Sequence, residues 1–278
     1  GLQVLQMIAY AGMGYFMLSD GLASVGREGI KPWSGMITPQ ETTEALQTAF
    51  KAPSADDYDG VDVTYINGTT WAEETVQCRL PGNSTPTKTE GYTLDGVLDE
   101  NRAYRIGMRR LLGYRLQRLQ HSLSTEMDAL CYEYMDRLIL ADDIPGSQTL
   151  SCLITSMSYN SSVITLTLSE PPDWSFDNPR VIIRHQDGNA SAMIVPTRIG
   201  DFTISIPYTA ALAPESWLMD EPAIEPPRLL FCSSTRVPYD VLVGEIAPGN
   251  DGVSQVSAVQ YHPGKYAYDD AAYPGDVA

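Results

Sequence analysis

Paired carboxylates are the residues of this sequence whose spacing could support catalysis. Asp56/Asp57, Asp142/Asp143 and Asp269/Asp270 each place two acids side by side, and two carboxylates can act as the acid and the nucleophile of a glycosidase. Adjacent residues of a strand point to opposite faces, however, and these pairs lie in expected turns, where Asp is favoured for backbone reasons. We therefore assign no catalytic role to these pairs.

The histidines and cysteines form no reactive motif either. His121, His185 and His262 are scattered and stand in no Gly-x-Ser-x-Gly, His-Glu-x-x-His or Cys-with-His pattern. The widely spaced cysteines, Cys78, Cys131, Cys152 and Cys232, contain no Cys-x-x-Cys pair, so free buried thiols are expected and a zinc or redox site is not.

The short glycine-containing segments do not resemble phosphate loops. Gly12-Met-Gly14 and the segment 244–249 lack the Lys, Ser or third Gly that such loops need at the right spacing. The sequence therefore predicts no catalytic, cofactor-binding or metal-binding residue and no cofactor.

The charge balance is strongly acidic. The 278 residues include 35 Asp and Glu against 18 Lys and Arg, a formal charge of −17, which disfavours contacts with phosphate groups. Six arginines do cluster between positions 102 and 118, but Arg is a good helix former and the chain offers many carboxylates as partners. Neither nucleic-acid recognition nor a bound nucleic acid is expected.

The apolar run Leu2–Leu18 is too short and too often interrupted for a membrane span. No Lys or Arg precedes it, and Gln3 and Gln6 lie within it. We expect no membrane insertion by this chain, which begins with Gly and is interpreted as part of a longer protein.

Two helices are predicted. Leu2, Leu5, Ile8 and Ala9 recur at helical spacing before Gly12 and Gly14, and an Asp20-Gly21 hairpin turn is expected to follow a strand over 15–18. A longer helix is predicted over 100–118, with Asp99 as its cap. Its buried stripe is expected at Tyr104, Met108, Leu111, Leu112 and Leu119.

The sequence outside these two helices predicts mainly short strands separated by turns. Val61, Val63 and Tyr65 alternate with polar residues, as in a half-buried strand that pairs with 71–80, and residues 81–91 are expected to be a loop. A proline-rich, extended connection is expected over 207–227. Further strands are predicted at residues 120–125, 137–141, 163–168, 181–185, 190–195, 203–206, 239–246 and 253–261.

Three stretches together resemble the tail proteins of phages and prophages, the group of the host-specificity tail-tip proteins of the lambda J type. The first joins a helix to an Asp-Gly hairpin over 2–21. The second, which is the most specific, combines 56–65, 99–107 with its Arg-rich helix, and 138–146. The third is the closing pair 241–246 and 256–266.

The resemblance implies a structural rather than enzymatic role at the tail tip of a virion. Such a baseplate hub is a homotrimer that contacts distal tail and tape-measure proteins and surrounds a passage for DNA, which it does not bind specifically. Because an acidic wall repels phosphate, we expect carboxylates to line that passage. The receptor-binding part of the family commonly lies farther toward the C-terminus.

The predicted fold class is α+β and predominantly β. We expect an α+β fragment over 1–45, a tube-like hub β-barrel with a flanking helix built from 46–150 and 226–278, and an inserted all-β domain over 151–225. Two other function classes remain open. A carbohydrate-binding or adhesin-like β module predicts an exposed aromatic platform, and a cell-wall glycoside hydrolase predicts a cleft with two carboxylates.

The aromatic residues near the C-terminus bear on the first of these alternatives. Tyr261, Tyr266, Tyr268 and Tyr273 could stack on sugars. Packing against the preceding sheet is the expectation for them instead.

Overall fold

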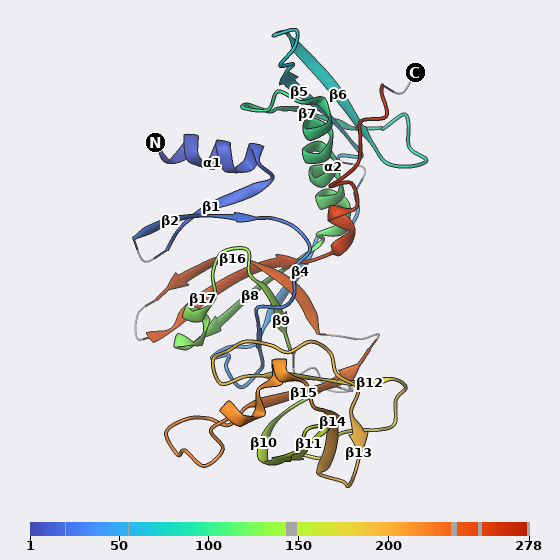
Figure 1. The fold of residues 1–278 in the computed structure, drawn as a ribbon. Coiled ribbons are helices and arrows are strands. Elements are labelled where there is room, and N and C mark those ends of the chain that lie inside the picture. The colour runs from blue at the N-terminus through green and yellow to red at the C-terminus, as the bar shows by residue number, and fades with distance from the viewer. Residues whose placement is uncertain (20, 55, 143–148, 235–237, 250–251, 277–278) are drawn as a thin grey trace. The chain divides into compact units, whose positions relative to one another are not determined.

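The computed structural model describes residues 1–19, 21–54, 56–142, 149–234, 238–249 and 252–276. It is predominantly β with a few helices, which confirms the predicted class (Figure 1). The helices are α1 (Leu2–Ala11), α2 (Glu100–Leu116) and the short 3-10 turns η1 (Met127–Cys131), η2 (Ala210–Leu212), η3 (Pro214–Ser216) and η5 (Pro263–Tyr266). No helix in these ranges is long and apolar enough to cross a membrane.

Short strands make up most of the regular structure. In chain order they are β1 (Gly14–Ser19), β2 (Leu22–Arg27), β3 (Gly35–Ile37), β4 (Gln47–Phe50), β5 (Gly60–Ile66), β6 (Glu73–Arg79), β7 (Thr89–Thr93), β8 (Leu119–Thr125), β9 (Arg137–Leu140), β10 (Leu150–Tyr159), β11 (Val163–Leu168), β12 (Pro179–Arg184), β13 (Thr197–Arg198), β14 (Thr203–Pro207), β15 (Arg228–Ser233), β16 (Tyr239–Pro248) and β17 (Ser254–Gln260).

The chain divides into two compact units. Unit 1 consists of Gly1–Ile30, Ala49–Gln120 and Gln260–Ala278, and unit 2 of Lys31–Thr48 and His121–Val259. The boundaries expected after residues 45, 150 and 225 do not coincide with the limits of these units.

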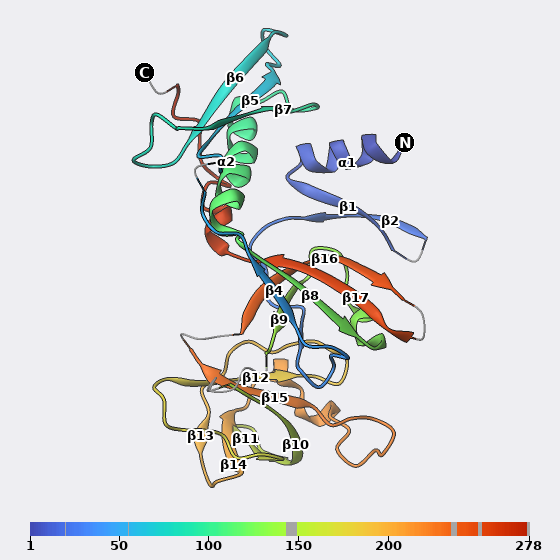
Figure 2. The same ribbon diagram turned by 180° about the vertical axis from the view of Figure 1, so that it is seen from behind.

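Unit 1 contains a three-stranded sheet that α2 covers (Figure 2). The order is β6-β5-β7, with β5 antiparallel to β6 and parallel to β7. Val61, Val63 and Tyr65 of β5 are buried, which confirms the alternating pattern of the sequence and its predicted pairing with β6. Residues 89–91, which were expected in a loop, belong instead to β7, whose Thr, Glu and Gly residues give no alternating apolar pattern.

Helix α2 has the expected cap and buried stripe. The Asp99 carboxylate accepts a hydrogen bond from the amide of Arg102 at 2.8 Å, and Tyr104, Met108, Leu111 and Leu112 are buried. Leu119 lies beyond the helix, in β8, and is half-buried. Close contact between helix and sheet depends on Gly107, because a Cβ there would lie 2.4 Å from Cys78 Sγ and 2.6 Å from Val63 Cγ2.

Unit 2 contains a six-stranded sheet of order β3-β9-β16-β17-β8-β4 that curls into a half-barrel. Strand β9 pairs antiparallel with β16 and parallel with β3. Its core includes Leu138 and Leu140 of β9 and Val241 and Val243 of β16. The predicted closing pair is confirmed as β16 and β17.

A second six-stranded sheet in unit 2 has the order β12-β15-β10-β11-β14-β13. Strand β10 joins its two halves: Leu150–Leu153 pair with β15, and after an irregularity between Ile154 and Ser156 the strand continues along β11. Phe231 of β15 lies at the core, with the rings of Trp174 and Phe176 edge-on at 5.0 and 5.6 Å.

Strands β10, β13 and β15 of this second sheet were not predicted, and one predicted strand did not form. Strand β15 is a continuous apolar run buried on both faces and therefore shows no alternation, and β10 is rich in Ser and Thr. The predicted strand over 190–195 is irregular and meets the sheet only at the bridges Val181↔Ile194 and Arg184↔Ala190. The connection expected over 207–227 is not simply extended, because η2 and η3 interrupt it.

The predicted turn at Asp20-Gly21 and two other turns between strands fall partly outside the described residues. Asp20, residues 143–146 of the turn after β9, and residues 250–251 of the β16–β17 loop are among them. At the first hairpin, Ser19 pairs with Leu22 and Gly21 has φ 77°.

Candidate assembly surface

Helix α1 carries no charged side chain, and most of its large apolar side chains are exposed. Its ten residues, LQVLQMIAYA, include no charged side chain, and Val4, Leu5 and Ile8 are 51, 46 and 60% exposed. The helix ends where predicted: the amide of Gly12 donates to the carbonyls of Ile8 and Ala9, although Met13 rather than a glycine takes the left-handed conformation, at φ 62°. A surface helix normally turns its apolar side chains toward the core.

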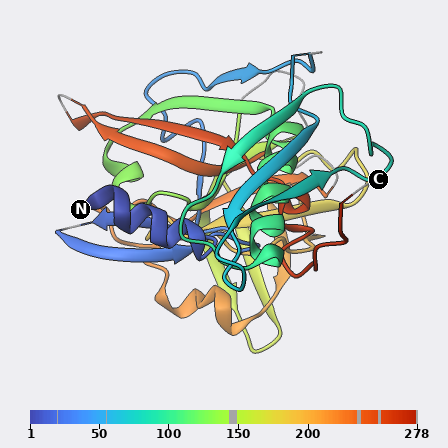
Figure 3. The ribbon, with the colours of Figure 1, turned by 90° about the horizontal axis from the view of Figure 1, so that it is seen from above.

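Helix α1 lies along the β1–β2 hairpin (Figure 3). Tyr15 pairs with Gly26, and a Cβ at Gly26 would lie 2.3 Å from the tyrosine ring, so the glycine makes room for Tyr15. Phe16 and Val25 are directly opposite on the other face. Leu18, Leu22 and Val25 are 62, 72 and 66% exposed.

These exposed residues of α1, β1 and β2 form what we call the α1–hairpin surface. A two-stranded hairpin is only marginally stable by itself. Monomeric proteins rarely expose a large contiguous apolar patch, and such patches mark interaction sites. The α1–hairpin surface is therefore the part of the described chain best suited to be covered by another protein.

A second exposed apolar group lies at the tip of the β5–β6 hairpin. Trp71 is 73% exposed and has φ 53°, a left-handed conformation that is unusual for a bulky residue. The amide of Trp71 donates to Asn67 O at 2.8 Å, and the Asn67 and Thr70 side chains both donate to the Glu74 carboxylate. The loop thus holds a strained tryptophan in a fixed position in solvent.

The arginines of α2 bind groups within unit 1. Arg109 and Arg110 pair with Asp269 and Glu90, while Arg118 at the end of the helix pairs with Asp57. Arg102 and Arg105 donate to backbone carbonyls. Five of the six arginines therefore serve contacts within unit 1, as the interpretation as a structural helix predicted.

The acidic pairs do not converge in a reactive arrangement. Asp57 also binds Lys51, and hydrogen bonds from Arg118 and Ser54 hold the pKa of Asp57 well below its usual range. Asp269 binds Arg109, and Asp143 lies outside the described residues. In the described ranges, no group of three or more His, Cys, Asp or Glu side chains could hold a metal ion.

The histidines lie in separate environments. His121 is buried, with Nδ1 3.0 Å from Thr48 Oγ1, and burial lowers its pKa. Nδ1 of His262 accepts the amide hydrogen of Gly264, while His185 lies edge-on to Trp217.

All four cysteines are free. Cys78, Cys152 and Cys232 are buried, as predicted for free thiols, whereas Cys131 is exposed, contrary to that expectation. Burial raises the pKa of Cys78 and Cys152 to about 12 and that of Cys232 to about 11.

The tyrosines near the C-terminus are not an exposed platform. Tyr261 and Tyr266 are buried. Tyr268 and Tyr273 pack on Tyr104 of α2, with ring centroids 6.2 and 5.4 Å away, rather than on the preceding sheet as expected.

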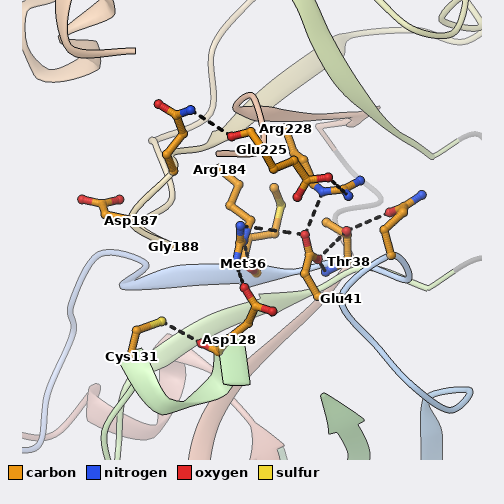
Figure 4. Close-up of polar contacts among 12 residues, drawn as sticks. Met36, Thr38, Glu41, Asp128, Cys131, Arg184, Asp187, Gly188, Glu225 and Arg228 are labelled. Atoms are coloured by element: carbon orange, nitrogen blue, oxygen red, sulfur yellow. Dashed lines mark hydrogen bonds and ion pairs between the residues drawn. The ribbon is translucent and has the colours of Figure 1, made fainter. Parts of the chain in front are cut away.

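Unit 2 contains a buried ion cluster that was not predicted from the sequence (Figure 4). Oε1 of Glu41 lies 2.9 Å from Nε of Arg228 and 3.9 Å from Nη1 of Arg184. Oε2 accepts hydrogen bonds from the amide and hydroxyl of Thr38. Because a buried carboxylate needs charged and hydrogen-bonding partners, the cluster fixes β12 and β15 to the loop after β3.

Two more acids complete this cluster. Asp128 lies 3.3 Å from Arg184, and Glu225 pairs with Arg228. Nε of Arg184 also donates to the carbonyl of Met36. Oε2 of Glu41 accepts two hydrogen bonds and Oε1 makes only ion-pair contacts, so the arrangement serves attachment. Its residues are far apart in sequence, and no local sequence pattern predicts the cluster.

No protein-family model matches the chain, and no curated protein sequence matches it. Among solved structures, it is similar to a chain in the virion of a native gene transfer agent particle, with 13% identity and a TM-score of 0.48 over 99% of this chain and 40% of that one. It is also similar to the tail protein from Neisseria meningitidis MC58, with 11% identity and a TM-score of 0.37 over 75% of this chain and 55% of that one. The chain thus spans less than two thirds of either structure.

Proposed function

We propose that the protein is a structural, non-enzymatic component of the tail tip of a tailed phage or prophage, located in the virion. Copies of it form a homotrimeric baseplate hub that supports host attachment. The observation that carries the proposal is the exposed, apolar α1–hairpin surface, because contiguous exposed apolar patches mark sites of interaction with other proteins. The resemblance of the three sequence stretches to tail proteins supports the same role.

Other tail components and DNA complete the proposed setting. Distal tail and tape-measure proteins are the further protein partners, and DNA passes through the ring without specific binding. The net charge of −17 suits a wall that repels phosphate. Mapping the carboxylates in an experimental structure of the ring tests this part, and a passage lined mainly by Lys and Arg contradicts it.

The domain division is part of the proposal. Residues 46–150 and 226–278 form the hub barrel, residues 1–45 an α+β fragment, and residues 151–225 an insertion. Pairing of β15 with β10 and β12 argues for extending the insertion to residue 233. Limited proteolysis tests this division, since a protected fragment of about residues 150–233 is expected if the insertion folds independently.

Light scattering across a concentration series tests self-association. The unmodified chain is expected to give the mass of a trimer, and Leu5→Glu/Ile8→Glu is expected to give a monomer, because burying two new carboxylates costs several kcal/mol. The control Ile199→Glu/Phe202→Glu changes two exposed apolar residues of unit 2 and should leave the mass unchanged. A wild-type monomer at every concentration contradicts assembly through the α1–hairpin surface.

A further inference from the structure

A cavity of about 900 Å³ lies beside the second sheet of unit 2. One wall is the irregular segment 189–195, and the other is formed by segments 207–218 and Ile224. Its apolar lining includes Met193, Leu212 and Trp217. Val195, Leu218 and Ile224 also line it and remain 56, 49 and 39% exposed. The cavity therefore offers apolar surface that the described chain leaves open to solvent.

The first wall resembles an incomplete strand. Ser191 donates its amide hydrogen to Ile183 O and Ile194 to Val181 O, at 2.8 and 2.9 Å. Strand β12 is at the end of the sheet order, so this segment covers its edge at two bridges. In an extended segment, alternate backbone groups turn to the opposite side. An added peptide strand can pair with such groups.

The second wall is fixed by one side chain. Nε2 of Gln186 donates to Leu218 O at 2.9 Å and to Glu225 O at 2.8 Å, and Oε1 accepts from the amide of Leu218 at 2.9 Å. The cavity is thus preformed, which reduces the entropy lost when a ligand binds.

The charge around the cavity is negative. Segments 185–195 and 207–224 contain Asp187, Glu215, Asp220 and Glu221 and no Lys or Arg, and all four acids are exposed. Burial lowers the pKa of His185, whose ring therefore does not offset these charges at neutral pH. A cationic ligand is favoured and an anionic one is repelled.

We infer that this cavity binds an extended peptide segment whose apolar side chains are flanked by Lys or Arg. The apolar walls contact the central side chains of the peptide, and the 189–195 segment pairs with its backbone. The exposed acids of the neighbouring segments attract its basic flanking residues. A sugar is less suited, because Trp217 is 7% exposed and presents no open ring face. The inference is independent of the assembly role and of the α1–hairpin surface.

Calorimetric titration of the whole chain tests the site with two defined probes. The first is the blocked peptide Lys-Val-Leu-Val-Lys and the second is Glu-Val-Leu-Val-Glu. The basic peptide is expected to bind saturably below about 1 mM, with an affinity that falls as salt rises, and the acidic peptide is not. Absence of binding by both, or equal binding of both, overturns the inference.

Variants locate the site. Ala192→Trp places a large ring in the cavity and should remove binding at any salt concentration. Glu215→Gln/Asp220→Asn/Glu221→Gln should weaken binding about tenfold at low salt. Its control, Glu126→Gln/Glu133→Gln/Glu245→Gln, neutralises three exposed acids elsewhere in unit 2 and should have no effect. Binding that survives Ala192→Trp, with an unchanged circular-dichroism spectrum, overturns the assignment to this cavity.

Discussion

Arg109 of α2 and Asp269 of the C-terminal segment form a two-point ion pair, with Nε–Oδ1 2.6 Å and Nη2–Oδ2 2.5 Å. The Arg109 side chain is only 7% exposed. Two of its other N–H groups donate to the carbonyls of Met13 and Glu28. One guanidinium thus binds all three chain segments of unit 1.

Asp269→Asn is expected to lower the free energy of unfolding by about 3 kcal/mol, because it leaves a buried guanidinium without its closest counter-charge. Urea denaturation measures the change. The neighbouring Asp270 is exposed, so Asp270→Asn should change stability by less than about 0.5 kcal/mol. Equal effects of the two substitutions contradict the buried pair.

Two glycines of α2 should respond in opposite ways to the same substitution. Gly107→Ala is expected to destabilise by about 2 kcal/mol, because the new Cβ meets Cys78 and Val63. At Gly113 the nearest atom to a Cβ is 3.4 Å away, and Gly113→Ala should stabilise the helix by about 0.5 to 1 kcal/mol. Thermal unfolding of both variants checks this, and a stabilising Gly107→Ala contradicts the close packing of α2 on the sheet.

Removal of the Trp71 side chain should not cost stability. Trp71→Gly relieves the left-handed strain, whereas Trp71→Ala removes the ring and keeps the strain. The glycine variant is therefore expected to be more stable than the alanine variant by about 1 kcal/mol, as measured by urea denaturation. The reverse order shows that the loop does not impose this conformation.

Stability should fall as the pH drops below the ordinary histidine pKa of 6.5. Burial lowers the pKa of His121 in the folded state, and its buried Nε2 has no hydrogen-bond partner. The unfolded chain therefore binds the proton more readily, and stability present above pH 6.5 is lost below it.

His121→Gln should flatten this dependence between about pH 7 and 5, where the slope for one proton is at most about 1.4 kcal/mol per pH unit. Glu90 affects stability only at lower pH, because its hydrogen bond with Arg110 lowers its pKa below 4.5. Urea denaturation at each pH separates the contribution of His121 from that of Glu90. If the slope of stability against pH is unchanged in His121→Gln, this histidine does not have the proposed role.

Local sequence patterns correctly predicted the helices and strands in which apolar residues are buried and polar residues are exposed. The capped helix α2 and the alternating strand β5 were predicted because each shows one polar and one apolar face. Strand β15 was missed because both of its faces are buried. The 190–195 segment was misjudged because it lines a cavity and meets β12 only at two isolated bridges.

The candidate sites depend on information that a local pattern lacks. The composition of α1 is visible in the sequence, but that its apolar residues stay exposed is not. Glu41, Arg184 and Arg228 meet only through the topology of unit 2, since each belongs to a different element of the fold. Charge pairs of this kind form only once the chain has folded and cannot be predicted from a local sequence pattern.

The three-segment construction of unit 1 affects the order in which a growing chain can fold on the ribosome. Strands β10–β15 have all their partners within residues 150–233 and can pair as soon as these residues emerge. Helix α2 can pack on β5 and β6 once it is made, but the contacts of Tyr104 and Arg109 must wait for residues 268–273, which supply Tyr268, Asp269 and Tyr273. Until synthesis reaches them, the side of α2 that carries Tyr104 and Arg109 lacks these partners and stays open to chaperones and to wrong partners.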